Sequence, residues 1–275
     1  MAALLALLSS GMWGTADYVA GRMSRTRWVV LVLFVSQAFG LLFMLVLATA
    51  TGAWPSARAV AVPAVLASAT GAGGLLLYYR ALATGVMGVV APIASLGVVV
   101  PLAAGVLGGE RASAAQAAGI ALSLVGVVLA SGPELRGDSG WRPVALALGA
   151  AAMFGLSLVC IARGSETSVT MTMTGMRLTT VTVLSLGLLV TRRRIAVRAR
   201  ELPAYAAVGV LDVGANLAYG LATTRGLLML AGVFGSLYPV VTILLARFLD
   251  DERLRRIQQV GVVLCLAGVA AISAG

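Results

Sequence analysis

Long apolar runs follow one another along this 275-residue chain, and the polar breaks between them are short. A run of about 20 apolar residues is long enough to cross the hydrocarbon core of a bilayer as a helix. Charged residues make up 11% of the chain, whereas soluble proteins carry roughly 25%. We therefore predict an all-α membrane protein that crosses the bilayer many times and has no room for a separate soluble domain.

Charged residues, prolines and glycines divide the apolar sequence into ten expected transmembrane helices. No positive residue precedes Arg22, so the chain lacks the basic start of a signal peptide, and the first run is expected to remain as a span. The expected ranges are 2–21, 29–51, 59–83, 86–108, 114–131, 143–163, 171–191, 204–224, 227–249 and 257–274.

The two halves of the chain resemble each other. Met12-Trp13-Gly14 matches Met153-Phe154-Gly155, and the same separation relates Tyr78 to Tyr219. We call this separation the repeat spacing. Any single match is weak, but the matches share one order and one spacing. Further pairs at the repeat spacing or, after a single insertion, one position beyond it are Arg22 and Arg163, Ser24 and Ser165, Glu110 and Glu252, Gly119 and Gly261, and Gly126 and Gly268.

Each expected repeat, 1–134 and 141–275, contains five spans. Because five is an odd number, the second repeat enters the membrane from the opposite side. The sequence thus predicts two inverted five-helix repeats, related by a pseudo-two-fold axis in the membrane plane. Folds of this kind place a substrate site near the midplane between the repeats. They are typical of carriers.

Short motifs in both halves are Trp13-Gly14, Tyr79-Arg80-Ala81-Leu82, Val90-Ala91-Pro92, Gly109-Glu110-Arg111, Gln116, Gly119, Asp251-Glu252-Arg253, Gln258, Gly261 and Gly268. In these residues the chain resembles the EamA-type drug/metabolite transporter superfamily, over essentially its whole length. The resemblance implies ten transmembrane helices, a central cavity and export of small metabolites, amino acids or drugs. It does not fix a substrate.

All 20 basic residues are arginines, and the net charge is +10. The expected loops after spans one, seven and nine carry most of them, whereas Arg58, Arg111, Arg163 and Arg225 lie on the opposite face. By the positive-inside rule the arginine-rich face is cytoplasmic, which places both termini outside. We expect a bacterial cytoplasmic (inner) membrane and contact with the lipid bilayer. Because the chain offers no folded basic module, we expect no nucleic-acid partner.

Asp17 and Asp212 are the acids that lie well inside apolar runs, and Arg177 lies inside the seventh span. Charges at this depth are costly and mark a substrate or ion path unless they are paired. Asn216 follows Asp212 by four residues and shares its helix face. Gln37 lies beside the first-half position equivalent to Arg177. We interpret these residues as substrate-cavity or coupling candidates.

In this interpretation Asp17 or Asp212 carries a coupling proton or meets a cationic substrate group, with Arg177 as counter-ion. The alternative is a buried Asp–Arg pair that fixes how helices pack, or an acid that reaches the interface. The position equivalent to Asp17 in the second half is Leu158, so the acids are not repeated.

Trp13, Tyr78 and Tyr219 are the aromatic candidates for the cavity. Trp13 shares a helix face with Asp17. The repeat pairs Tyr78 with Tyr219, so we rank these two tyrosines above Tyr79 and Tyr238. The alternative for each is a place in the aromatic belt at the membrane interface. We name Pro92 and Pro239, in spans four and nine, as candidate hinges or kinks, because proline removes a backbone hydrogen-bond donor.

Enzyme chemistry is not expected. The chain has no histidine and no lysine, which excludes histidine metal motifs and a phosphate-binding loop of the GxxxxGK[ST] type. An intramembrane aspartyl protease needs paired carboxylates that share a proton, and Asp212 lies in Leu-Asp-Val-Gly, not in Gly-x-Gly-Asp. We expect no catalytic residue, no metal and no cofactor.

The sequence therefore predicts a secondary active transporter that exports a small organic molecule by alternating access, with protons as the coupling ion. A first alternative is a facilitative or uptake carrier for a small, cationic metabolite. A second is a membrane scaffold or flippase accessory subunit that transports nothing. The expected oligomeric state is a monomer or homodimer.

Overall fold

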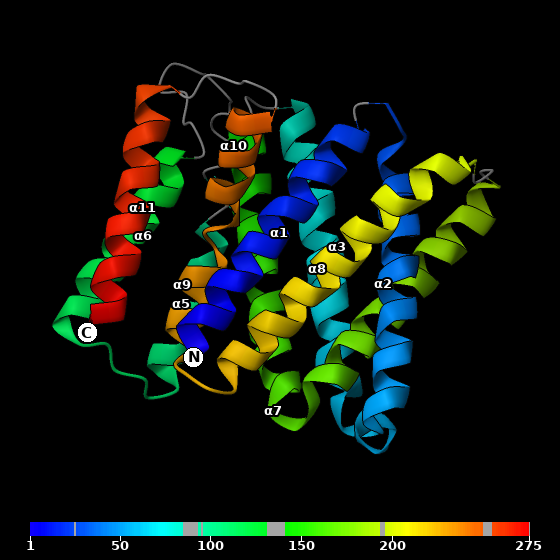
Figure 1. Ribbon diagram of the computed structural model, residues 1–275, viewed down its shortest axis with the longest axis horizontal. Coiled ribbons are helices and arrows are strands. Elements are labelled where there is room, and N and C mark those ends of the chain that lie inside the picture. Colours follow the sequence, from blue (N-terminus) through cyan, green and yellow to red (C-terminus); the bar gives the residue numbers. More distant parts are fainter. Residues whose placement is uncertain are drawn as a thin grey trace.

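The computed structural model describes residues 1–24, 26–84, 93–94, 96–130, 141–192, 196–249 and 255–274. Within these residues the chain is helical and contains no strand (Figure 1). The α-helices are α1 (Ala2–Ser24), α2 (Val29–Thr51), α3 (Ala57–Thr84), α5 (Val99–Leu107), α6 (Ala114–Ala130), α7 (Trp141–Thr191), α8 (Leu202–Thr223), α9 (Leu228–Gly235), α10 (Tyr238–Leu249) and α11 (Arg256–Ala274). The 3₁₀ turns are η1 (Trp54–Ser56), η2 (Leu96–Val98) and η3 (Ala199–Glu201).

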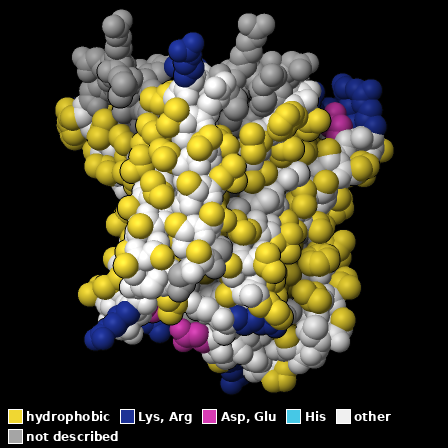
Figure 2. Space-filling model, turned by 60° about the vertical axis from the view of Figure 1, so that its left-hand side comes forward, with side chains coloured by type: hydrophobic (Ala, Val, Ile, Leu, Met, Phe, Trp, Pro, Cys, Tyr) yellow, Lys and Arg dark blue, Asp and Glu magenta, His cyan; other side chains and the backbone are white. Residues whose placement is uncertain are grey.

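Helix length and composition agree with a protein that crosses a membrane several times. Four helical segments of the described residues are long and apolar enough to span a bilayer: Val29–Thr51, Trp54–Tyr78, Trp141–Thr191 and Ala199–Thr223. Helix α1 has 23 residues but lies outside this set, since it carries Asp17 and several small polar residues. Figure 2 shows hydrophobic side chains over the middle of one face, with charged atoms near its upper and lower edges.

Helix α7 differs from the sequence-based expectation. The expected spans 143–163 and 171–191 form one helical element of 51 residues, broken at Ser168 by an extended backbone (φ −161°, ψ 110°). Figure 1 shows α7 turning sharply near its middle. The Ser168 hydroxyl accepts a hydrogen bond from the Met171 backbone N–H at 3.3 Å. Ser168 therefore acts as the N-cap of the second half of α7.

The expected span 227–249 is also interrupted. Helix α9 ends at Gly235 and α10 begins at Tyr238. Pro239 is the second residue of α10, where a missing backbone donor costs no helical hydrogen bond. The proline lies at a helix break, not inside a continuous helix. Pro92, the kink candidate named in the first half, lies outside the described residues.

Helices from the two halves pack against each other throughout the molecule. Helix α3 lies along α7, α1 along α8, α6 along α11, and α5 against α9. Helix α1 also packs on α9 and α10, while α7 packs on η2 and α5. Figure 1 shows α6 and α11 side by side at one end, with both termini in the lower half of the view.

Close contacts of glycines recur at the repeat spacing. A Cβ on Gly14 would lie 2.6 Å from the Tyr238 carbonyl oxygen and 2.5 Å from Val241 Cβ. Gly155, the second-half equivalent of Gly14, approaches the carbonyl oxygen of Gly97 and Val100 Cβ in the same way. These two residues are the first-half equivalents of Tyr238 and Val241.

Helices α6 and α11 repeat this behaviour at the slightly longer spacing that relates Gly119 to Gly261. A Cβ on Gly119 would lie 2.7 Å from the Gly268 carbonyl oxygen, and one on Gly126 would lie 2.8 Å from that of Gly261. Gly119 corresponds to Gly261 and Gly268 corresponds to Gly126, so the two contacts are equivalent under the repeat. Small residues thus let both pairs of backbones approach closely.

Candidate functional site

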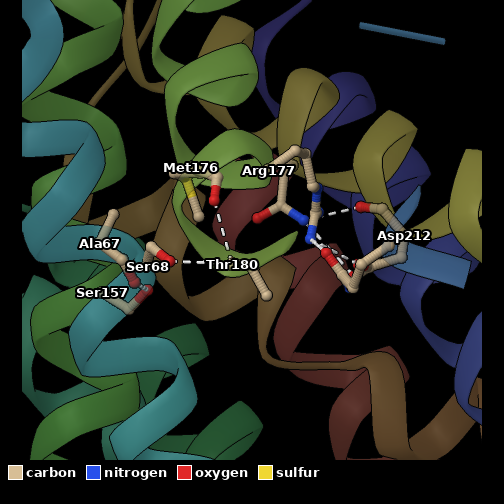
Figure 3. A network of polar contacts seen from close by, with 9 residues as sticks. Ala67, Ser68, Ser157, Met176, Arg177, Thr180 and Asp212 are labelled. Carbon is tan, nitrogen blue, oxygen red and sulfur yellow. Dashed lines mark hydrogen bonds and ion pairs between the residues drawn. The ribbon is translucent and has the colours of Figure 1, made fainter. Parts of the chain in front are cut away.

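Three helices contribute to one polar cluster inside the molecule. Arg177 Nη1 of α7 lies 3.0 Å from Asp212 Oδ2 of α8. Gln37 of α2 joins them: its Nε2 donates to Asp212 Oδ2 at 2.9 Å, and its Oε1 accepts from Arg177 Nη1. Figure 3 shows Arg177 and Asp212 facing each other across the helices.

Asn216 supports the carboxylate from one turn further along α8. Its Nδ2 donates to the Asp212 carbonyl oxygen at 2.7 Å and approaches Asp212 Oδ1 at 3.5 Å. The structure therefore brings together Gln37, Arg177, Asp212 and Asn216, four of the candidates named from the sequence. We refer to these four residues as the Asp212 cluster.

The Asp212 cluster is largely removed from water. The Arg177 side chain is 7% exposed and that of Asp212 is 26% exposed. Taking a guanidinium out of water is costly, and a carboxylate with good geometry offsets that cost only in part. Arg177 Nη2 is buried and has no hydrogen-bond partner among the described residues. Among the described residues, the guanidinium is therefore bound through Nη1 and not through Nη2.

The equivalent place in the first half has neutral chemistry. Asp212 corresponds to Gly71 of α3, and a Cβ on Gly71 would lie 3.2 Å from Ser157 Oγ of α7. Ser157 Oγ donates to the Ala67 carbonyl oxygen at 2.7 Å. Nearby, the Ser68 and Thr180 hydroxyls lie 2.8 Å apart (Figure 3). Sequence reasoning did not name these hydroxyl contacts, because single Ser and Thr residues in apolar helices give little signal.

Asp17 stands apart from the Asp212 cluster. It makes no hydrogen bond or ion pair with any described residue, and its side chain is exposed. Its carboxylate interacts electrostatically with that of Asp212 and with the Tyr238 phenol.

Aromatic rings pack around this region in two equivalent sets. Trp13 contacts Tyr219 with ring centroids 5.9 Å apart, and Tyr238 with centroids 6.4 Å apart. Tyr78 contacts Phe154 at 6.2 Å. The repeat spacing that relates Trp13 to Phe154 also relates Tyr78 to Tyr219, so one ring pair is the repeat of the other.

The three aromatic candidates thus lie in these ring contacts, and the structure adds two rings that were not chosen. Tyr238 ranked below Tyr78 and Tyr219 because the repeat pairs those two tyrosines with each other. Phe154 had a signal, since it is the repeat of Trp13. Tyr219 is fully buried, and its hydroxyl has no partner among the described residues.

Two further polar contacts join the halves at opposite ends of the molecule. Arg27, between α1 and α2, forms an ion pair with Glu201 of η3. Glu110, between α5 and α6, accepts backbone hydrogen bonds from Leu228 at 2.6 Å and Met229 at 2.9 Å, at the start of α9. Figure 1 places the α1–α2 connection at the upper end and the α5–α6 connection at the lower end.

The described residues contain no group of three or more histidine, cysteine, aspartate or glutamate side chains able to hold a metal ion. Cys160 and Cys265 are free thiols, partly and fully buried respectively.

Comparison with known proteins identifies the family. One solved structure, described only as "Crystal structure of protein", aligns over 99% of this chain and 97% of that chain, with a TM-score of 0.80 and 20% sequence identity. At this identity the likeness shows the fold. No curated protein matches the sequence. The EamA-like transporter family matches residues 1–132 and 141–274, nearly the whole chain in two parts. The chain therefore belongs to the EamA-like transporter family, whose members are membrane transporters of small molecules.

Proposed function

We propose that this family member is a secondary active transporter that exports a small organic molecule in exchange for protons. The observation that carries the proposal is the Asp212 cluster, whose residues lie on segments long and apolar enough to cross a membrane, together with Asp17 of α1. Ionisable groups at that depth are costly to a protein and mark a path for substrate or ions. A protein that merely anchored or scaffolded would have no need of them.

The proposed architecture is ten transmembrane helices in two inverted repeats, 1–134 and 141–275. Support comes from contacts that recur at the repeat spacing: Gly14 on α10 and Gly155 on α5, and the ring pairs that contain Trp13 and Phe154. In an inverted repeat, motion of one half against the other opens a central site to alternate sides.

The contacts at the two ends of the molecule fit such a motion. Arg27 to Glu201 joins the halves at one end, and Glu110 to the start of α9 joins them at the other. We propose that opening toward one side breaks one of these contacts while the other holds.

For coupling, we propose that a proton and the substrate compete for the interior acids. Asp212 is neutralised by Arg177, whereas Asp17 interacts electrostatically with Asp212 and the Tyr238 phenol and has no ion pair with a described cation. A proton or a cation at Asp17 would remove its repulsion with Asp212. Binding of one would thus exclude the other and link their movements.

The decisive experiment is transport by purified protein in liposomes. A metabolite library is first screened for compounds that raise the thermal midpoint, since a ligand that binds only the native state stabilises it. Uptake of each hit is then measured with and without an imposed pH gradient. We expect Asp17→Asn and Asp212→Asn to fold but to lose gradient-driven transport, while Glu166→Gln, which removes an exposed acid paired with Arg163, keeps it. Full gradient-driven activity in both Asn variants would contradict the coupling role.

Facilitated diffusion is the second candidate, and the Asp212–Arg177 pair itself favours it. An acid already held by a guanidinium at 3.0 Å can serve as structure alone. In that case transport proceeds down the substrate gradient in both directions, and a proton leak leaves the rate unchanged. Proton-coupled exchange predicts that the same leak abolishes accumulation.

A further inference from the structure

One face of α1 carries Asp17 together with a ring that packs against further aromatic rings. Trp13 precedes Asp17 by one helical turn and shares its face of α1. The Trp13 ring contacts the rings of Tyr219 of α8 and Tyr238 of α10. The rings therefore come from both halves of the chain.

The charges of the interior do not balance. Arg177 is the one described cation of the Asp212 cluster, and its charge is taken up by Asp212 at 3.0 Å and by Gln37. Asp17 has no ion pair among the described residues and carries an exposed side chain. The ionised form of Asp17 therefore carries an uncompensated negative charge. This charge is costly unless a proton or a cation neutralises it.

The rings define which cation fits. An ammonium group within about 6 Å of the face of Trp or Tyr is attracted by the ring quadrupole. Apolar substituents on the nitrogen would bury against the same rings. An anion meets the opposite conditions, since it would face Asp17, and Arg177 Nη2 is buried.

We propose that the central site binds an organic ammonium cation, with its charged nitrogen at Asp17 and its substituents against Trp13 and Tyr238. This assignment rests on the proposed function, because it names the class of molecule that the carrier moves. The Asp212 cluster then positions helices α2, α7 and α8 and holds a compensated charge. Asp17 and Trp13 make the direct contacts.

Calorimetric titration of the purified full-length protein in detergent at neutral pH tests the assignment. The probes are tetramethylammonium, choline and benzyltrimethylammonium, with benzyl alcohol and benzoate as neutral and anionic counterparts of the last. At least one ammonium probe is expected to bind, and neither counterpart. If all three cations fail to bind, or if benzoate binds as tightly as benzyltrimethylammonium, the proposal is wrong.

Variants locate the site. Asp17→Asn is expected to weaken cation binding about tenfold or more, because it removes a charged partner, while Asp17→Glu retains binding. Glu166→Gln makes the same change of net charge at an exposed ion pair and should leave the affinity unchanged. Trp13→Leu should weaken binding, whereas Trp13→Phe, which copies the Phe154 of the other half, should retain most of it. Undiminished binding by Asp17→Asn would overturn the proposal.

The two proposals fail separately. Cations that bind at Asp17 but do not cross liposomes would leave the binding assignment standing and reject transport. Transport of a neutral or anionic compound, with no binding of any cation probe, would leave the carrier function standing and reject the cationic substrate.

Discussion

At the scale of single residues, the interior combines one satisfied acid and one unsatisfied acid. Asp212 has Arg177, Gln37 and Asn216 as partners, whereas Asp17 has no hydrogen bond or ion pair within the described chain. The sequence presented both simply as acids in apolar runs. Which of them is paired depends on the neighbours that other helices supply, and sequence spacing along one helix says nothing about those.

The Arg177–Asp212 pair should show strong energetic coupling. Arg177→Gln and Asp212→Asn each leave a partner without its counter-charge, so each should lower the unfolding free energy. The double variant leaves no lone charge and should be destabilised by less than the sum of the two, with an interaction energy of about 1–3 kcal/mol. Thermal and denaturant unfolding of the four proteins in detergent measures this cycle. Simple additivity would mean that the pair is solvated and contributes no coupling.

At the scale of elements, close helix contacts depend on glycine at specific positions. Gly14 brings α1 against the start of α10, where the Tyr238 carbonyl oxygen and Val241 occupy the space of a Cβ. Gly11 lies one turn earlier on the same helix, with nothing within 4 Å of its own Cβ position. Both are glycines in apolar sequence, and the packing alone distinguishes them.

Gly14→Ala should therefore destabilise the protein by about 1–3 kcal/mol, since the added methyl group overlaps a backbone carbonyl. Gly11→Ala should be neutral or stabilising by about 0.5–1 kcal/mol, because alanine loses less backbone freedom in a helix than glycine. Thermal unfolding in detergent compares them. Gly155→Ala should behave like Gly14→Ala if the two halves pack equivalently. Equal effects at positions 11 and 14 would contradict the packing of α1 on α10.

The ion pair between the α1–α2 connection and η3 should depend on pH. Its hydrogen bond from Arg27 lowers the pKa of Glu201 below its ordinary value of 4.5, with a smaller contribution from the Arg198 backbone N–H. Because the folded-state pKa is the lower one, the contact stabilises the folded protein above pH 4.5 and is lost as the pH falls through the lowered pKa.

The difference in thermal midpoint between the wild type and Glu201→Gln should accordingly be constant near neutral pH and shrink in acid. Midpoints measured over a series of buffers in detergent follow this directly. Arg27→Gln serves as the matched variant, because it removes the other partner of the ion pair. Its thermal midpoint should lack the pH dependence that the ion pair contributes. A midpoint difference that grows as the pH falls would show that another group sets it.

At the scale of the whole molecule, arginines and termini define an orientation. The loop between α7 and α8 contains five arginines, Arg192, Arg193, Arg194, Arg198 and Arg200. Both termini lie at the opposite end from the α1–α2 connection (Figure 1). We propose that the arginine-rich end faces the cytoplasm, as the positive-inside rule favours.

Cysteine labelling tests this orientation. With Cys160 and Cys265 replaced, we expect Ala2→Cys to react with an impermeant thiol reagent in intact cells and Ala196→Cys to react only after lysis, because the N-terminus and the α7–α8 connection lie at opposite ends (Figure 1). Labelling of position 196 but not of position 2 in intact cells would reverse the assignment.

The sequence by itself determined the membrane class, the helical composition, the family and the residues worth testing. Apolar run length and the repeat spacing are local or linear properties, so they can be read from the sequence without knowledge of packing. Only the tertiary structure decided that Gln37, Arg177 and Asp212 meet, that Asp17 has no counter-ion among the described residues, and that Ser168 divides α7. Those outcomes depend on how each helix is rotated about its axis against its neighbours, and long-range packing sets that rotation.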